Sequence, residues 1–501
     1  MNLNIYFLTD YENTYHLHKL AGILKKEGIA NELGIQISGQ KYHQDIKNQN
    51  EINYDYIHLV QNVAKGFRSN RINKDKIDEY EERFGGPFLQ QYVLGDRHCI
   101  NFTYKNQLRF LQRWFSFYDK FFSEFNPDLV ITDGLAAAPS LIPFRLVQDY
   151  GGHGLWWRTT RIKNRQAFHI DSAYEDFYEV HGLYERLKTG EVDASSFPKA
   201  RQNAKDHLHE FRETGETQAP LQRYDINTFK RKVQKLTLAA PRYIRYWYLY
   251  NISRTSTIKK DDYTRPPTTE RVRNDLEQVY RKYCIKYSDV FEKPNNDENF
   301  VYFPLHLQPE YSTMYLAPMY LNQIEVIRKI SKSIPANHKL YVKEHPSMIK
   351  KRGWREMDYY KELKSLSNVE LINPFTNSHS LIKESELVTT ITGTAGFEAV
   401  MYKKPAIVFG KPHYRVIPLV YNCDSPENLS QLIQIALSDH EHNDEVLLKY
   451  LTALFEKSFE MPSNVAQSPK ERAEERADAV FPHLVKQINK IYSQQHPQGL
   501  I

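Results

Sequence analysis

Polar side chains follow a predicted strand in the second half of the chain. The segment Lys339–Lys343 has the apolar sequence KLYVK, and Glu344, His345 and Pro346 follow it. A histidine ring can donate a hydrogen bond to a phosphate, and the proline fixes the turn that directs it. Open α/β sheets bind ligands beyond the carboxyl ends of their strands. His345 and Pro346 are therefore candidates for binding an anionic group.

A second polar cluster follows the predicted strand Phe300–Leu305, in the sequence LHLQPEYST. Its candidate residues are Gln308 and Glu310. Glu310 can bind a base or ribose, or act as a general acid or base. Polar residues at three successive strand ends would form one rim, which is stronger evidence for a site than any single motif.

A turn of small residues, TGTAG, separates a predicted buried strand from a predicted helix. The candidate ligands in this turn are Thr392, Gly393, Thr394 and Gly396. Glycines let a ligand approach the backbone, and the free N–H groups of a helix N-terminus favour phosphate. Glu398 lies one turn into the helix and can reach a sugar hydroxyl. The alternative is a tight strand–helix turn capped by a threonine.

The first half of the chain offers one carboxylate in a comparable position. Asp133 follows the predicted buried strand Asp128–Thr132 and precedes Gly134. We expect Asp133 at the rim of a cleft, where it acts as nucleophile or base, or else caps the next helix. Asp171 and Glu175 are weaker alternatives for this carboxylate.

Three cationic side chains follow the next turn and strand. They are His153, Arg158 and Arg161. Arginine forks bind carboxylates and phosphates in a bidentate manner. These residues are candidates for binding an acidic donor sugar or an acceptor phosphate.

Strand and helix patterns alternate in both halves of the chain. This alternation predicts an α/β fold with mostly parallel sheets. The predicted strands are Asn4–Leu8, Tyr54–Val60, Asp128–Thr132, Gly154–Thr159, Phe300–Leu305, Lys339–Lys343, Val369–Ile372, Glu386–Ile391 and Pro405–Phe409. The predicted helices are Tyr15–Lys26, Leu108–Phe125, Ala136–Tyr150, Leu321–Ser333, Ser378–Glu384, Thr394–Tyr402 and Ser425–Leu437.

The length of 501 residues is too great for one hydrophobic core. We expect an N-terminal α/β lobe over 1–174 and a helical insertion or connector over 175–296. A second α/β lobe is expected over 297–440. Helices over 441–501 follow, and we expect them to pack back on the N-terminal lobe.

Composition excludes several classes of protein. The net charge of +6 is small, and acidic residues balance the basic ones, so nucleic acid is not an expected partner. Cys99, Cys284 and Cys423 are far apart, which argues against a disulfide framework or a zinc site. The opening MNLNIYFLTD lacks the pattern of a signal peptide, and no run of about 18 apolar residues occurs. We therefore expect a cytoplasmic location.

One segment departs from this charge balance. Residues 226–260 contain no acidic residue and nine basic ones. The interleaved aromatic residues are Tyr243, Tyr246, Trp247, Tyr248 and Tyr250. A basic aromatic helix can lie on anionic lipid headgroups at the cytoplasmic face of the inner membrane. The alternative is a solvated helix that packs its aromatic side chains on the core.

The motifs LHLQPE, KEHP and TGTAGFEAVMYKKPAIVFGKPHY follow one another between Val301 and Tyr414. In type, order and spacing they resemble the capsule polysaccharide biosynthesis protein family, which includes Kdo transferases. The resemblance implies a GT-B fold, with two Rossmann-like lobes facing a cleft. It also implies a nucleotide site in the C-terminal lobe. The N-terminal lobe, whose sequence matches the family only loosely, would supply a catalytic carboxylate and the acceptor site.

The resemblance further implies individual roles in the C-terminal lobe. His345, Thr392 and Thr394 would contact the phosphate of a donor such as CMP-Kdo. Gln308 and Glu310 would face the nucleotide or the cleft. Such donors need no metal, in agreement with the absence of a DxD motif, and no cofactor is expected beyond the nucleotide-sugar itself.

The main hypothesis is therefore a metal-independent glycosyltransferase of capsule or surface polysaccharide biosynthesis. Its partners would be a nucleotide-sugar donor and a glycan or glycolipid acceptor. A GT-B-like nucleotide-sugar epimerase is the first alternative, because it uses the same lobes and similar turns. The second alternative is a catalytically inactive scaffold of capsule assembly.

Overall fold

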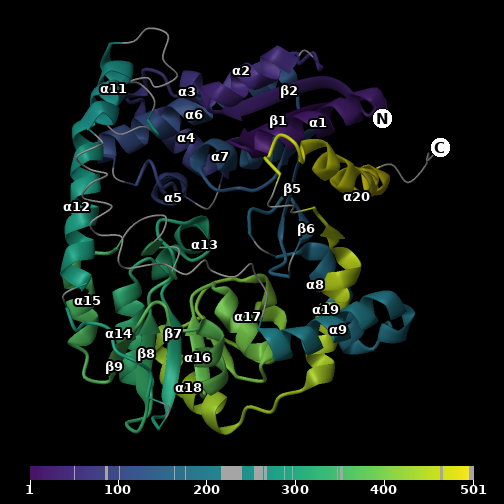
Figure 1. Cartoon of the computed structure of the whole chain (residues 1–501). Helices are drawn as coiled ribbons and strands as arrows, with labels where there is room; N and C mark the ends of the chain where they lie inside the picture. Colours follow the sequence, from purple (N-terminus) through teal and green to yellow (C-terminus); the bar gives the residue numbers. More distant parts are fainter. Residues whose placement is uncertain are drawn as a thin grey trace.

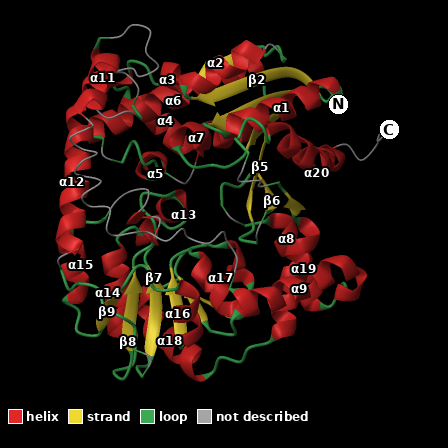
Figure 2. Cartoon of the chain, viewed as in Figure 1, coloured by secondary structure: helices red, strands yellow, loops and turns green. Residues whose placement is uncertain are grey.

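Two mostly parallel sheets, each between layers of helices, build the two lobes of the chain (Figure 1, Figure 2). The structure, a computed structural model, describes residues 1–49, 51–84, 88–100, 102–162, 164–174, 176–215, 240–252, 263–264, 268–286, 288–295, 297–346, 348–349, 354–462 and 467–495. The expected α/β class, with two Rossmann-like lobes in a GT-B-like arrangement, is confirmed.

The N-terminal sheet has seven strands and the C-terminal sheet has six. In spatial order the first contains β13 (Phe459–Glu460), β6 (Arg165–Ile170), β5 (His153–Thr159), β4 (Leu129–Thr132), β1 (Leu3–Asp10), β2 (Ala30–Ser38) and β3 (Tyr56–Leu59). The second contains β12 (Val420–Asn422), β11 (Ala406–Val408), β10 (Leu387–Thr390), β7 (Phe300–Pro304), β8 (Lys339–Lys343) and β9 (Val369–Ile372). Among the strands that the structure describes, only the pairs β5–β6 and β6–β13 are antiparallel.

The central strands are buried on both faces, which explains their nearly continuous apolar sequences. In β1, Ile5 enters one hydrophobic core and Tyr6 enters the core on the opposite face. In β7, Val301 packs in one hydrophobic core and Tyr302 packs in the core on the opposite face of the sheet. Side chains alternate across a strand, and parallel sheets are covered by helices on both sides, so both alternate sets must be apolar.

The helices cover these sheet faces and connect the lobes (Figure 2). Those of the N-terminal lobe are α1 (Asn13–Lys26), α2 (Gln40–Gln49), α3 (Val60–Val63), α4 (Lys74–Phe84), α5 (Leu89–Leu94), α6 (Tyr104–Phe125) and α7 (Ala138–Leu146). Those of the C-terminal lobe that follow β7 are α13 (Tyr311–Met314), α14 (Gln323–Ser333), α15 (Met357–Lys364), α16 (Ser378–Glu384), α17 (Thr394–Met401) and, after the last strand of this sheet, α18 (Leu429–Ser438). The others are α8 (Tyr178–Thr189), α9 (Pro198–Thr214), α11 (Ala240–Asn251), α12 (Thr268–Lys286), α19 (Asp444–Lys457) and α20 (Ala473–Gln495).

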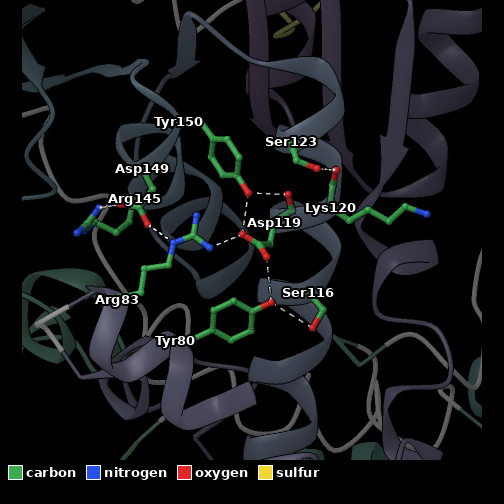
Figure 3. Close-up of polar contacts among 9 residues, drawn as sticks. All are labelled: Tyr80, Arg83, Ser116, Asp119, Lys120, Ser123, Arg145, Asp149 and Tyr150. Carbon is green, nitrogen blue, oxygen red and sulfur yellow. Dashed lines mark hydrogen bonds and ion pairs between the residues drawn. The ribbon is translucent and has the colours of Figure 1, made fainter. Parts of the chain in front are cut away.

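Polar contacts hold the helical layer of the N-terminal lobe together (Figure 3). The guanidinium of Arg83 on α4 lies 2.5 Å from Asp119 on α6 and 2.9 Å from Asp149. The Tyr150 hydroxyl also donates to a carboxylate oxygen of Asp119, at 2.7 Å. Because Asp119 receives both donors, it fixes α4 and the segment after α7 against the long helix α6.

The chain crosses between the lobes more than once. After β6, helices α8 and α9 pack on α19, and Leu183 and Leu208 join the core of the C-terminal lobe. The chain returns through β13, which pairs with β6, and through α20, which packs on α1. Leu484 of α20 thereby enters the core below the N-terminal sheet. Among the described residues, none of the helices has the length and apolar character needed to cross a bilayer.

We predict that Gly152→Ala destabilises the protein by about 2 kcal/mol or more. A Cβ at Gly152 would lie 2.2 Å from the carbonyl oxygen of Pro127, which belongs to the backbone and cannot move aside. The matched control is Gly182→Ala in α8, where a Cβ would meet nothing within 4 Å. Since alanine is the better helix former, this control should gain up to about 1 kcal/mol. The midpoints of urea denaturation would measure both changes, and equal midpoints would contradict the prediction.

Candidate functional site

The loops that follow β7, β8 and β10 meet at the carboxyl edge of the C-terminal sheet. These strands are neighbours in the order β10-β7-β8. The backbone N–H of Thr392 donates to Nε2 of His306 at 3.2 Å. Arg355, at the end of the loop after β8, donates to the His306 carbonyl oxygen at 2.7 Å. The structure therefore brings the three predicted polar segments together.

His306 lies at the centre of this edge, although the sequence interpretation selected its neighbours Gln308 and Glu310. Burial, together with the charges of His345 and Arg355, lowers the pKa of His306 to about 3, so its ring is neutral. Because Nε2 accepts from Thr392, the ring proton resides on Nδ1. This buried Nδ1 makes no hydrogen bond of ordinary geometry to the described residues, although a contact with the Gln323 side chain partly opposes the lowering of the ring's pKa. A buried donor of this kind is normally satisfied by a neighbouring side chain, by water or by a ligand.

Gln308 and Thr392 use their side chains to hold the loops together. The Gln308 amide donates to the Leu321 carbonyl at 2.9 Å and accepts from Gln323 at 2.8 Å. The Thr392 hydroxyl donates to the Ser312 carbonyl at 2.8 Å. Both side chains therefore fix the loops at this edge of the sheet relative to one another.

The helix α17 begins at the same edge, with Gly393 as its N-cap and Thr394 as its first residue. A Cβ at Gly396 would lie 2.5 Å from the hydroxyl of Tyr414, which donates to the Gly393 carbonyl. Glycine is therefore required for this packing as well as for any approach of a ligand. The N-terminus of α17 presents a partial positive charge to the edge.

The strand β8 ends in a buried charge pair. Glu344 is buried and accepts from Arg355 at 2.7 Å and from the Tyr360 hydroxyl at 2.8 Å. It also accepts from the backbone N–H of His345 at 2.9 Å. This arrangement fixes the start of the loop, whereas His345 itself is exposed and Pro346 half-buried.

Two further charged groups lie beside this edge. Burial lowers the pKa of Lys343 to about 8, and the charges of Glu398 and Glu344 oppose that shift. Glu398 on α17 therefore lies close to the end of β8. Glu310 is exposed at the N-cap of α13, where its carboxylate accepts from the Ser312 hydroxyl at 3.2 Å.

Arg158 and Arg161 reach this edge from the N-terminal lobe. The Arg158 guanidinium lies 5.0 Å from the centre of the Tyr311 ring, a cation–π contact across the lobes. Burial lowers the pKa of both His306 and His413, and in both the charge of Arg161 contributes to the shift. The positive charge of this region between the lobes therefore comes from the two arginines, and the two histidines lie near Arg161 as neutral rings.

The structure separates His153 from these arginines. His153 opens β5, whereas Arg158 lies near the other end of the same strand. The His153 ring nitrogen Nδ1 lies 2.7 Å from Asp171, and that hydrogen bond raises the pKa of His153. The alternative carboxylate Asp171 is thus engaged in this pair. The other alternative, Glu175, lies outside the described residues.

Asp133 lies at the carboxyl end of β4 and faces two basic side chains. Its carboxylate lies 2.8 Å from Nε2 of His16 and 3.3 Å from Arg476 of α20. Burial raises the pKa of Asp133, but the hydrogen bond from His16 and the charge of Arg476 outweigh it and hold that pKa below its usual value. The helix-capping alternative is wrong, because the N-cap of α7 is Ala137.

A second carboxylate, Asp10, lies at the same carboxyl edge of the N-terminal sheet and was not selected from the sequence. It ends β1, the neighbour of β4, and accepts from the Ser38 hydroxyl at 2.6 Å. Burial raises the pKa of Asp10, and the Ser38 hydrogen bond and the Arg97 charge only partly oppose it. The same strand-end rule that selected Asp133 could have found Asp10 in the sequence FLTDY.

Within the described part of the chain, no group of three or more His, Cys, Asp or Glu side chains could hold a metal ion. The candidate site consists instead of hydrogen-bond donors, arginines and single carboxylates. Such groups bind anions and move protons.

These features define a GT-B-like protein in which three polar loops meet at the carboxyl edge of the C-terminal sheet. Residues 286–431 match the family described as capsule polysaccharide biosynthesis protein. The family resemblance that the motifs indicated is therefore confirmed over this part of the chain. The comparison with curated protein sequences finds no match.

Several solved structures are similar at low identity. The KpsC beta Kdo 2,4 transferase of Thermosulfurimonas dismutans is 14% identical, with 68% of this chain and 83% of that chain covered and a TM-score of 0.37. The beta Kdo 2,7 transferase of the same organism's KpsC is 12% identical, with 71% and 86% covered and a TM-score of 0.36. The UDP-GlcNAc 2-epimerase of Neisseria meningitidis, bound to UDP-GlcNAc, is 11% identical, with 96% and 99% covered and a TM-score of 0.23. Likenesses of this size support no conclusion about the activity of this chain.

We predict that Glu344→Gln destabilises the protein by about 3 kcal/mol, because it leaves the buried Arg355 without its countercharge. The matched control is Glu356→Gln, since Glu356 is 71% exposed and pairs with Arg281 at 2.7 Å. An exposed pair contributes about 1 kcal/mol at most. Thermal or urea unfolding would measure both changes, and similar losses in the two variants would contradict the assigned role of Glu344.

Proposed function

We propose that this protein is a glycosyltransferase of capsule or surface polysaccharide biosynthesis. It would take a sugar from a nucleotide-activated donor and pass it to a glycan or glycolipid acceptor. The family match over residues 286–431 supports this proposal, because it contains the three loops of the candidate site. By their names, the KpsC proteins mentioned above are Kdo transferases, and the epimerase structure contains bound UDP-GlcNAc.

One observation carries the proposal. The buried Nδ1–H of His306, the N-terminus of α17 and the exposed His345 lie at one edge of the C-terminal sheet. Arg161 approaches the same edge from the other lobe. A phosphate between the lobes would satisfy the buried donor and neutralise the positive region.

This arrangement suits the leaving group of glycosyl transfer. When the bond between the sugar and the phosphate breaks, negative charge develops on the phosphate oxygen. Fixed donors in a partly dehydrated site stabilise that charge without reorganising. A donor with one phosphate and an acidic sugar, as in CMP-Kdo, would also engage Arg158 through the sugar carboxylate. We propose such a donor, bound without a metal ion.

The pKa values of two carboxylates at the carboxyl edge of the N-terminal sheet shift in opposite directions. Asp133 is held ionised by His16 and Arg476, which suits a nucleophile or an electrostatic stabiliser. Asp10 has a raised pKa, which suits a base that removes a proton from an acceptor hydroxyl. Glu310 is the carboxylate on the opposite lobe and is proposed as a ligand of the donor.

We predict that the protein binds CMP, and that His345→Ala, Thr394→Ala and Arg161→Ala each lower the affinity about tenfold. Each variant removes one donor or charge from the proposed phosphate site. Titration calorimetry with CMP and UDP measures the affinities. Arg186→Ala on α8 is the control, because Arg186 is 53% exposed and pairs only with Glu191 in the described contacts. Failure of the protein to bind either nucleotide would overturn the proposed function.

We predict that Asp133→Asn lowers turnover by roughly a thousandfold or more while leaving nucleotide affinity unchanged. Asp10→Asn should lower turnover by roughly a hundredfold, as expected for loss of a general base. Release of free nucleotide in the presence of acceptor measures turnover, with Asp206→Asn on the exposed face of α9 as control. Conversion of the donor sugar without any acceptor would instead indicate an epimerase.

A further inference from the structure

The helix α11 exposes one apolar face to solvent. Ile244, Trp247 and Tyr248 share one side of the helix, and Ile252, directly after its last residue, continues that side through a backbone hydrogen bond to the Tyr248 carbonyl. Their exposed fractions are 68%, 49%, 51% and 54%. Single exposed apolar residues are common on protein surfaces, but four on one helical face form a patch that usually contacts something.

The opposite side of α11 packs on α12. Tyr246 is buried there and lies under the guanidinium of Arg271, at 4.5 Å from the ring centre. Tyr243 donates to Asp275 at 2.6 Å. These contacts fix the helix on the protein, so its exposed face is held outward.

A basic groove runs between the two helices. It has a volume of about 270 Å³. Its lining residues are Arg242, Tyr243, Arg245, Tyr246, Arg271 and Asp275, together with Leu249. The groove contains three arginines and one aspartate, so its net charge is positive. The aspartate also accepts a hydrogen bond from Tyr243. A phosphate group is the ligand that such a set of guanidinium groups favours.

We propose that α11 docks this protein on an anionic phospholipid surface. The four exposed apolar residues would enter the boundary between headgroups and acyl chains. Arg242, Arg245 and Arg271 would bind lipid phosphates in the groove beside it. This arrangement is that of an interfacial amphipathic helix, in which apolar insertion and basic residues act together.

Charge and side-chain type select a lipid surface over other occupants. The sequence from 226 to 260 contains nine basic residues and no acidic one, so it complements a negative surface. Ile244 and Ile252 are aliphatic and offer no stacking surface to nucleic acid bases, whereas they insert readily into lipid. In the view of Figure 1, α11 lies at the outer edge of the molecule, above α12 and level with the N-terminal lobe. The inference does not depend on the proposed enzymatic function.

Trp247 provides a direct reporter of docking. The chain has five tryptophans, and the other four are at most 7% exposed. Full-length protein would be mixed with phosphatidylcholine vesicles containing about one third phosphatidylglycerol. We expect co-sedimentation, a blue shift of the emission, and quenching by brominated acyl chains. Trp247→Phe should still sediment but lose the shift and the quenching.

Two double variants separate the components of docking. Ile244→Ser with Ile252→Ser, and Arg242→Gln with Arg245→Gln, should each weaken vesicle binding about tenfold or more. The controls are Met319→Ser, an apolar residue that is 90% exposed on the other lobe, and Arg186→Gln. Circular dichroism would verify that every variant is folded.

Three results would overturn the proposal. The first is absence of binding to the anionic vesicles, or equal binding by the double variants and the wild type. The second is an equal response of Trp247 to inorganic phosphate alone, which would indicate a phosphate site without lipid insertion. The third is a dimer in sedimentation velocity that the Ile244→Ser, Ile252→Ser variant dissociates, because the face would then bind a second copy of the chain.

Discussion

A continuous chain of buried hydrogen bonds joins the three loops on which the candidate site depends. Glu344, after β8, accepts from Arg355, and Arg355 donates to the carbonyl of His306, after β7. The His306 ring then accepts from the backbone of Thr392, after β10. Burial of any of these polar groups without its hydrogen-bond partner would cost free energy. The three loops therefore stabilise one another's conformation.

This chain also determines what the site offers to a ligand. Because Nε2 of His306 accepts from Thr392, its other nitrogen carries the proton. The turn that supplies Thr392 also starts α17, so the helix N-terminus is held at the same edge. These groups are fixed by the fold itself, so an anion bound at this edge would meet preorganised donors, which stabilise charge without reorganising.

Much of the fold was accessible from the sequence. The strand Lys339–Lys343 was predicted with its observed limits, and Phe300–Leu305 differs from β7 by one residue. The strand β2 was missed because Gly34 and Gln36 interrupt its apolar pattern. Gly34 is nevertheless required, since a Cβ there would lie 2.5 Å from the ring of Tyr6. Propensity is a weak guide where close packing against a neighbouring strand determines the residue type.

The candidate site was predictable in position but not in its internal contacts. The rule that ligands bind at strand ends located His345, Thr394 and Asp133 without any knowledge of partners. It could not show that Gln308 bonds to Leu321 and Gln323, because such partners depend on how separate loops fold against each other.

The two carboxylates of the N-terminal lobe show how distant parts of the chain set local chemistry. Asp10 and Asp133 end neighbouring strands, yet their pKa values shift in opposite directions. The difference arises because His16 donates to Asp133, and because α20 crosses back from the C-terminal lobe and places Arg476 beside the same carboxylate. Environments that push the pKa values of paired groups apart divide acid–base work between them. The return of the chain to its first lobe therefore does more than cover the sheet, since Arg476 also helps to hold the pKa of Asp133 below its usual value while that of Asp10 is raised.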